Sequence, residues 1–141
     1  MVNAGGARMS AFAVGQEFAP KSYPVTRELL IGYANASGDQ NPIHQNEEFA
    51  KSVGLPDVIA HGMFTMALAG RYASEIAGGS SAIHDFSARF TKPVVVPAGA
   101  TVEVTFSAKV AEVTESTVKI DITATCNGEK VLGMTKALFR I

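Results

Sequence analysis

Asp39 and His44 are the two residues whose types and spacing first suggest chemistry in this chain of 141 residues. They lie five positions apart, and Asn41-Pro42 between them excludes a regular helix. Because an imidazole titrates near neutral pH, His44 is suited to accept and return a proton. Lining a shared pocket, the two side chains would hold one water molecule between them. The alternative is that Asp39 only caps a turn and His44 is a surface residue, since short motifs often arise by chance.

A second group comes from His61-Gly62-Met63, which opens an apolar run with helical spacing. The first N–H groups of a helix have no intrahelical partner, and the helix dipole favours negative charge at that end. A carbonyl oxygen docked on the Gly62 N–H would be polarised as in an oxyanion hole, and glycine leaves room for that approach. The alternative is that Gly62 only permits close packing or caps the helix. We predict that His61 is a structural residue, hydrogen-bonded near the helix start, and not a proton carrier.

Other reactive side chains give weaker signals. Ser80-Ser81 near His84 and Asp85 resembles a nucleophile cluster only by composition, because the Gly-x-Ser-x-Gly turn is missing. Cys126 is the one cysteine, which excludes an internal disulfide, and its strand-like surroundings predict a small buried hydrophobic residue. The sequence has no Cys and His cluster with metal-ligand spacing, so we expect no metal site.

Composition and charge narrow the class of protein. With 12 basic and 13 acidic residues, a net charge of −1 and no basic run, nucleic acid is not the expected partner. No apolar run reaches about 18 residues, so we expect no membrane span. Residues 1–10 are interpreted as a flexible lead without the apolar core of a secretory signal, and a cytoplasmic location is the default expectation. The length predicts a single domain over residues 11–141.

The elements that must position these groups change from helical to strand-like along the chain. After a first strand or extended arm, helices are predicted at residues 26–36, 46–54 and 62–78, the last with a face of small residues. From Phe86 to Phe139, apolar and polar residues alternate, which predicts three or four antiparallel strands. Asn127-Gly128 is predicted to join the last two in a type I′ turn. This order indicates an α+β fold with the helices on one face of an antiparallel sheet.

These motifs, taken in order, resemble the signature of the MaoC-like (R)-specific enoyl-thioester hydratases. The resembling segments are Tyr33-Ala34-x-Ala36-Ser37-Gly38-Asp39-x-Asn41-Pro42-Ile43-His44, then Ile59-Ala60-His61-Gly62-Met63, then Ala88-Arg89-Phe90-x-x-Pro93-Val94. Chance occurrence of the first two together is improbable. Length and layout look closest to the small catalytic subunit of the actinobacterial (3R)-hydroxyacyl-carrier-protein dehydratases.

The resemblance implies a hot-dog fold, in which a curved antiparallel sheet wraps around one long helix. By the same resemblance, Asp39 and His44 are the catalytic pair and the Gly62 N–H binds a thioester carbonyl. Asn41 would support the loop, and Thr65 would stand in for a serine that some relatives carry in the long helix. The implied reaction is reversible syn addition of water across a trans-2-enoyl thioester of coenzyme A or acyl carrier protein. No cofactor is expected, because the thioester itself is the electron sink.

The resemblance also implies a partner subunit. The sheets of two subunits would pair edge to edge, in a homodimer or in a heterodimer with a related hot-dog subunit, and the substrate would enter near that interface. Two other functions stay open. An acyl thioesterase on the same fold usually needs an acid on or beside the long helix, where the sequence offers only Glu75, late in the run. A non-catalytic subunit of a heterodimeric dehydratase is the other, and the intact pair of Asp39 and His44 argues against it.

Overall fold

A computed structural model describes residues 12–141, so the predicted flexible lead, residues 1–10, lies outside the described residues. The elements follow in the order β1 (Glu17–Val25), α2 (Arg27–Ser37), a 3-10 helix (Pro42–His44), α3 (Glu47–Ser52), α4 (Gly62–Ala77), a 3-10 helix (Ser80–Ala82), β2 (Ile83–Phe90), β3 (Val102–Val113), β4 (Thr117–Cys126) and β5 (Glu129–Arg140). Within residues 12–141, no helix has the length and apolar character needed to span a membrane.

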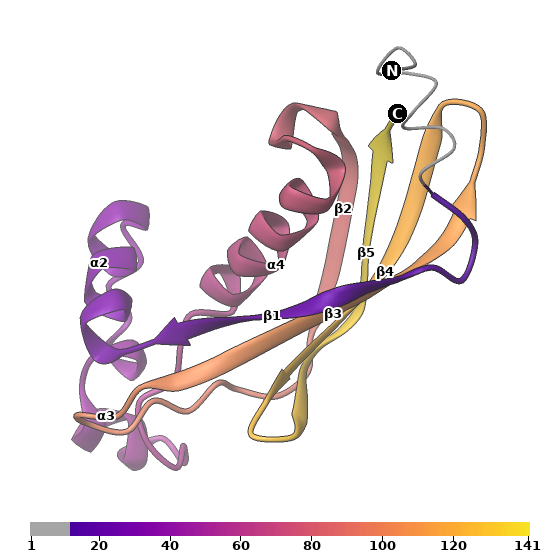
Figure 1. The fold of residues 1–141 in the computed structure, drawn as a ribbon. Coiled ribbons are helices and arrows are strands. Elements are labelled where there is room, and N and C mark those ends of the chain that lie inside the picture. The colour runs from indigo at the N-terminus through magenta and orange to yellow at the C-terminus, as the bar shows by residue number, and fades with distance from the viewer. Residues whose placement is uncertain (1–11) are drawn as a thin grey trace.

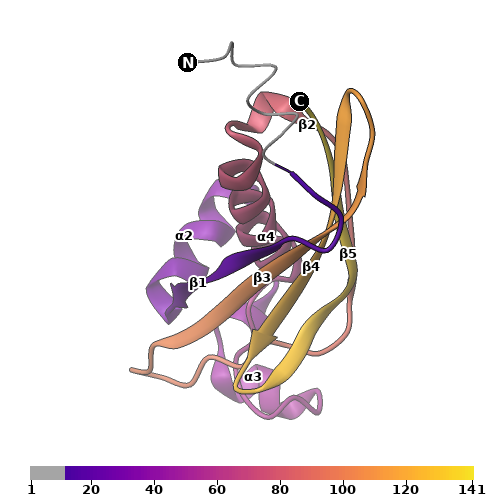
Figure 2. The same ribbon diagram turned by 45° about the vertical axis from the view of Figure 1, so that its right-hand side comes forward.

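All five strands form one antiparallel sheet in the order β1-β3-β4-β5-β2, and α4 lies along one face of its curve (Figures 1 and 2). Helices α2 and α3 gather beyond the end of the sheet toward which β1 runs (Figure 1). The predicted α+β class and the hot-dog architecture are confirmed. The second half of the chain holds four strands, β2 to β5. The N-terminal segment, for which the sequence allowed either an extended arm or a first strand, contains strand β1, which pairs with β3.

Local side-chain chemistry explains where the elements begin and end. Thr26 Oγ1 accepts a hydrogen bond from the Leu29 N–H at 3.2 Å, which caps α2, and Asn46 Oδ1 accepts from the Phe49 N–H at 2.9 Å, which caps α3. Between β4 and β5, Asn127 and Gly128 both have positive φ angles, of 52° and 79°, as a type I′ turn requires. The predicted caps and the predicted turn are therefore confirmed.

The small-residue face of α4 lets the sheet approach closely. Ala69 and Ala73 are completely buried, and they belong to one core together with sheet residues such as Phe106 and Phe139. Cys126 is buried in the same core, and burial raises the pKa of its thiol, as expected for a hydrophobic residue and not for a nucleophile. Helix α4 therefore packs against the sheet along its length, and its first turn contributes to the cavity described below.

Strand β5 departs from simple alternation at a bulge. Met134 has a φ of 46°, the register with both neighbouring strands shifts nearby, and two consecutive residues, Val131 and Leu132, are buried. A Cβ on Gly133 would lie 2.9 Å from the Thr91 side chain, so only glycine permits this approach. The bulge matters for function because Val131 and Leu132 line the cavity described below.

Candidate active site

The loop between α2 and the first 3-10 helix is held by its own side chains. Gly38 ends α2 with a φ of 84°, a conformation that glycine adopts without strain. Asp39 Oδ1 accepts a hydrogen bond from the Asn41 N–H at 3.1 Å, and Asn41 Oδ1 accepts from the Ile43 N–H at 3.2 Å. Asn41, expected to support this loop, thus caps the short helix that ends at His44.

His44 is buried, and one of its ring nitrogens is fixed by the main chain. Its Nδ1 lies 2.7 Å from the carbonyl oxygen of Ile59. A carbonyl oxygen can only accept, so Nδ1 carries the proton and Nε2 keeps a free lone pair. Burial holds the pKa of His44 below its ordinary value, although the Ile59 carbonyl and the Asp39 carboxylate oppose this shift. His44 is therefore neutral at pH 7 and suited to act as a base.

His61, predicted to be structural, lies directly against His44. The two rings stack with centroids 3.8 Å apart and planes 23° apart. The Tyr33 ring also contacts His61 in an edge-to-face arrangement, with centroids 4.8 Å apart. His61 Nε2 lies 3.1 Å from the main-chain oxygen of Asp39. The sequence indicated a hydrogen bond near the helix start, but it gave no sign of the stack, because the two histidines are 17 positions apart and no local pattern joins them.

The structure brings Asp39 and His44 together. A carboxylate oxygen of Asp39 and a ring nitrogen from each of His44 and His61 all lie within 4.8 Å of one another. One water molecule with two ordinary hydrogen bonds spans such a separation. Asp39 itself is exposed and does not line the neighbouring cavity, whereas His44 does.

A cavity of about 250 Å³ opens beside this pair. Gly62 and Thr65 of α4 lie on its wall with His44, and its other lining residues are Ile59, Ala60, Phe90, Thr91, Lys92, Pro93, Val94, Val131 and Leu132. Most of that lining is apolar. In the sequence, Phe90, Pro93 and Val94 belong to a motif of the resembling family. No sequence pattern assigns Val131 and Leu132 to a site, because the burial of both depends on a register shift between β4 and β5.

Gly62 is the first residue of α4, and no side chain caps that end of the helix. A Cβ at Gly62 would lie 3.2 Å from three ring atoms of Phe90, tighter than ordinary contacts. Gly62 therefore permits close packing against Phe90, as one of the alternatives from the sequence expects. Gly62 also lines the cavity, so the two roles do not exclude each other. Thr65, one turn later, is buried on the cavity wall, and its N–H donates to the His61 carbonyl at 3.2 Å.

Asp39, His44 and His61 are of two residue types that often bind metal ions, yet their geometry argues against a shared ion. An imidazole binds a metal in its ring plane at about 2.0–2.1 Å. The two rings are stacked with nearly parallel planes, so no point close to both rings lies in both planes. One nitrogen of each ring is also directed at a carbonyl oxygen. The absence of a metal site thus stays our expectation.

Glu75, the acid that a thioesterase would need, lies elsewhere. It is exposed near the end of α4, forms an ion pair with Lys21, and accepts a hydrogen bond from the Tyr23 hydroxyl at 3.3 Å. The hydrogen bond and ion pair with Lys21 hold the pKa of Glu75 below its ordinary value. Glu75 does not line the cavity beside His44.

A family model described as "MaoC like domain" matches residues 10–127 of this chain. The chain belongs to the MaoC-like domain family. It is 31% identical over 114 residues to a 3-hydroxybutyryl-CoA dehydratase of Methylorubrum extorquens, a match that covers 79% of this chain and 70% of that protein. The loop from Asp39 to His44 and the first turn of α4 both lie inside the matched region.

Two further similarities involve longer proteins. A 3-hydroxyacyl-thioester dehydratase X of Mycobacterium tuberculosis is 49% identical over 76 residues, which are 54% of this chain and 26% of that protein. A solved structure of a MaoC-like dehydratase superposes with a TM-score of 0.92 and 34% identity, covering 94% of this chain and 42% of that one. This MaoC-like chain thus corresponds to less than half of each of these two proteins.

Proposed function

We propose that this chain catalyses the reversible addition of water to trans-2-enoyl thioesters, with Asp39 and His44 as the catalytic pair and the Gly62 N–H as the ligand of the thioester carbonyl. The observation that carries this proposal is the placement of a carboxylate oxygen within 4.8 Å of an imidazole nitrogen, next to an apolar cavity that contains the start of α4. The dehydratase names of the similar proteins agree with this reaction.

Binding begins at the helix. The carbonyl oxygen of the thioester accepts a hydrogen bond from the Gly62 N–H, where the dipole of α4 favours negative charge. This contact draws electrons from the double bond toward the carbonyl oxygen, so C3 becomes electrophilic. The apolar lining formed by residues such as Val94 and Leu132 suits an acyl chain.

The water then adds to the polarised double bond. Asp39 and His44 hold it between them, and His44 accepts its proton on Nε2, since Nδ1 is already bonded to Ile59. The water oxygen forms a bond to C3 while the electron pair of the double bond moves onto the thioester oxygen. A proton from the pair then reaches C2 on the same face. Dehydration is the same sequence in reverse.

The partner subunit is also part of the proposal. Within residues 12–141, β1 and β2 are the edges of the sheet, so one side of each lacks a neighbouring strand. Phe90 at the end of β2 and Met63 at the start of α4 are large, apolar and more than half exposed beside the cavity. We infer that β2 pairs with a second hot-dog subunit, either a copy of this chain or a related one. Light scattering of the protein, alone and with candidate partners, distinguishes the two.

Turnover of a short enoyl-coenzyme A, followed as loss of enoyl absorbance, tests the reaction directly. Asp39→Asn and His44→Ala are expected to abolish turnover. Asp121→Asn is the control, at an exposed position away from the cavity and from β2. Assaying carrier-protein thioesters as well reveals which carrier is preferred, and release of free thiol detects a thioesterase. Hydration that is unchanged in both catalytic variants would contradict the proposal.

A further inference from the structure

Three hydrogen bonds join the catalytic loop to the segment that leads into α4. The Ile59 N–H donates to the Ile43 carbonyl at 3.2 Å, and His44 Nδ1–H donates to the Ile59 carbonyl at 2.7 Å. The third bond runs from His61 Nε2 to the main-chain oxygen of Asp39, at 3.1 Å. The first two fix His44, and the third is the one that ties Asp39 to the same segment.

The third bond also fixes the protonation of His61. Its acceptor is a carbonyl oxygen, so Nε2 must carry the proton, and Nδ1 of the neutral ring is left with a lone pair. That Nδ1 is buried and has no hydrogen-bond partner among residues 12–141. Leaving a buried acceptor unpaired is costly. If the ring served only to fill space, phenylalanine would fill it without this cost, so the retained nitrogen atoms call for a functional reason.

The ring of His61 has a second contact, with the catalytic imidazole. His44 lies face to face with it at 3.8 Å, while Tyr33 presses on His61 from the side of α2. The charged or titratable groups that face His44 are His61, the Asp39 carboxylate and, across the cavity, Lys92, which is paired with Glu129 at 3.2 Å. A stacked second imidazole disfavours a positive charge on His44, whereas the Asp39 carboxylate favours it.

We propose that His61 is a positioning residue for the catalytic pair. Its Nε2–H donates to the main-chain oxygen of Asp39, and its ring stacks on the His44 imidazole. One buried side chain therefore sets the distance between the Asp39 carboxylate and the His44 imidazole. The expected effect of His61 on turnover rests on the proposed hydratase function. The expected protonation and contacts of His61 do not depend on that function, and a measurement without substrate tests them.

Nitrogen NMR of the uniformly labelled wild-type protein near pH 7 reads the tautomers of the histidines directly. The expected result is a neutral His44 protonated on Nδ1 and a His61 that carries a proton on Nε2. A His61 with its only ring proton on Nδ1 overturns the proposal. The result does not depend on turnover, so a failure here is distinct from a failure of the proposed reaction.

Two substitutions then separate the roles of the hydrogen bond and the ring. His61→Phe keeps the stacked ring and loses the donor, while His61→Gln keeps a donor near the position of Nε2 and loses the ring. We expect His61→Phe to lower kcat about 10- to 100-fold with KM nearly unchanged, because misplaced catalytic groups cost rate and not binding. We expect His61→Gln to keep most of kcat and to raise the pH at which His44 titrates. Asp121→Asn, at an exposed position of β4 away from the cavity and from β2, serves as the control.

The opposite results contradict the proposal in distinguishable ways. Wild-type kcat in His61→Phe would show that the bond to Asp39 has no role. Equal losses in both variants, with an unchanged titration of His44 and an unchanged pH profile, would reduce His61 to a packing residue. If neither variant folds, the tautomers of the wild-type protein decide. If the wild type does not hydrate enoyl thioesters, the tautomers and the His44 titration still decide the positioning role.

Discussion

The Nδ1 of His44 lies 2.7 Å from the carbonyl oxygen of Ile59, a residue 15 positions further along the chain. This bond fixes which nitrogen carries the proton and so leaves Nε2 with a free lone pair. It also ties the loop from Asp39 to His44 to the segment that leads into α4. The proposed base and the proposed carbonyl ligand, Gly62, are thus held by one short piece of chain.

The pH dependence of stability follows from the burial of His44. Because the pKa of His44 is lowered in the folded protein, the unfolded chain binds a proton more readily than the folded one. As pH falls through about 6.5, the ordinary pKa of histidine, and on to the lower folded value, the free energy of unfolding should decrease. Urea unfolding of wild type and His44→Gln at several pH values measures this. The variant should lose the part of the decrease due to His44, and identical pH profiles would contradict the assignment.

The same shift predicts the acid limb of the catalytic profile. In the proposed reaction His44 accepts a proton in its neutral form. Turnover should therefore fall as pH decreases through the folded pKa of His44, and should persist below the pH at which an exposed histidine is protonated. A profile of kcat/KM against pH measures this. An acid limb at or above about 6.5 would mean that the group that controls hydration is not the buried His44.

Gly62→Ala tests the contact between the start of α4 and Phe90. The added methyl group would lie 3.2 Å from the Phe90 ring, so the ring must shift, and since Phe90 also lines the cavity, substrate binding should suffer. We expect a loss in kcat/KM of about tenfold, equivalent to about 1.4 kcal/mol. Because contacting residues are not additive, the double variant with Phe90→Ala should recover part of that loss. A purely additive double variant would contradict the steric explanation.

Local chemistry made much of the fold predictable from sequence. Thr26 and Asn46 were predicted as N-caps from residue type and position, and Asn127-Gly128 as a type I′ turn, because each depends on interactions within a few residues. The pair of Asp39 and His44 was accessible for the same reason, since a rigid spacer separates them by only a short distance along the chain.

Features formed between distant segments were not predictable. The stack of His44 on His61 depends on how the loop after α2 meets the start of α4, which no periodicity encodes. In β5, a register shift against β4 between Leu132 and Lys130 leaves Val131 outside the regular pairing. Val131 and Leu132 are both buried there, whereas strict alternation predicts only one of the two to be buried. The lining of the cavity therefore had to come from the structure.

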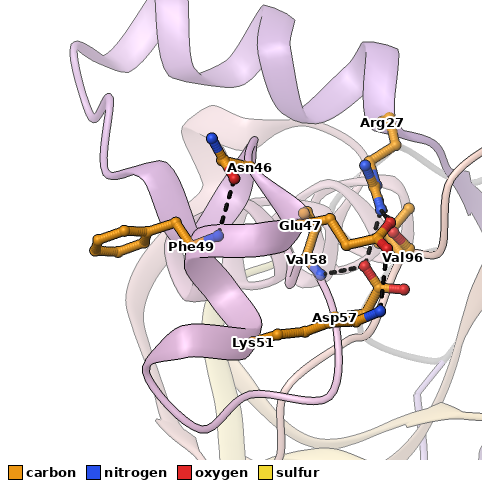
Figure 3. A network of polar contacts seen from close by, with 8 residues as sticks. All are labelled: Arg27, Asn46, Glu47, Phe49, Lys51, Asp57, Val58 and Val96. Atoms are coloured by element: carbon orange, nitrogen blue, oxygen red, sulfur yellow. Dashed lines mark hydrogen bonds and ion pairs between the residues drawn. The ribbon is translucent and has the colours of Figure 1, made fainter.

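Arg27, at the start of α2, joins that helix to the segments around Asp57 and Val96 (Figure 3). Its Nε donates to the Val96 carbonyl at 2.6 Å, and its Nη2 lies 2.9 Å from Asp57, which in turn accepts from the Val58 N–H. The side chains of Arg27 and Asp57 are only 18% and 17% exposed, so losing one leaves the other poorly solvated.

Replacing Arg27 with alanine should therefore destabilise the protein by about 1–3 kcal/mol, the cost of unpaired buried polar groups. Chemical denaturation measures the change. Lys51→Ala is the control, because Lys51 is exposed and pairs with Glu47 on the surface of α3, where an ion pair contributes little (Figure 3). Equal stability losses in the two variants would show that the Arg27 contacts are no stronger than a surface pair.

Thr65 has a buried side chain that lies on the cavity wall with Gly62 and His44. Two substitutions separate the effect of its hydroxyl group from that of its methyl group. Thr65→Val keeps the shape and removes the hydroxyl group, whereas Thr65→Ser keeps the hydroxyl group and removes a methyl group. If that hydroxyl group hydrogen-bonds the substrate, Thr65→Val should lower kcat/KM about tenfold, since one such bond contributes about 0.5–1.5 kcal/mol. Thr65→Ser should remain near wild type. The reverse order, with the serine variant the weaker enzyme, would assign Thr65 to packing against the acyl chain and not to hydrogen bonding.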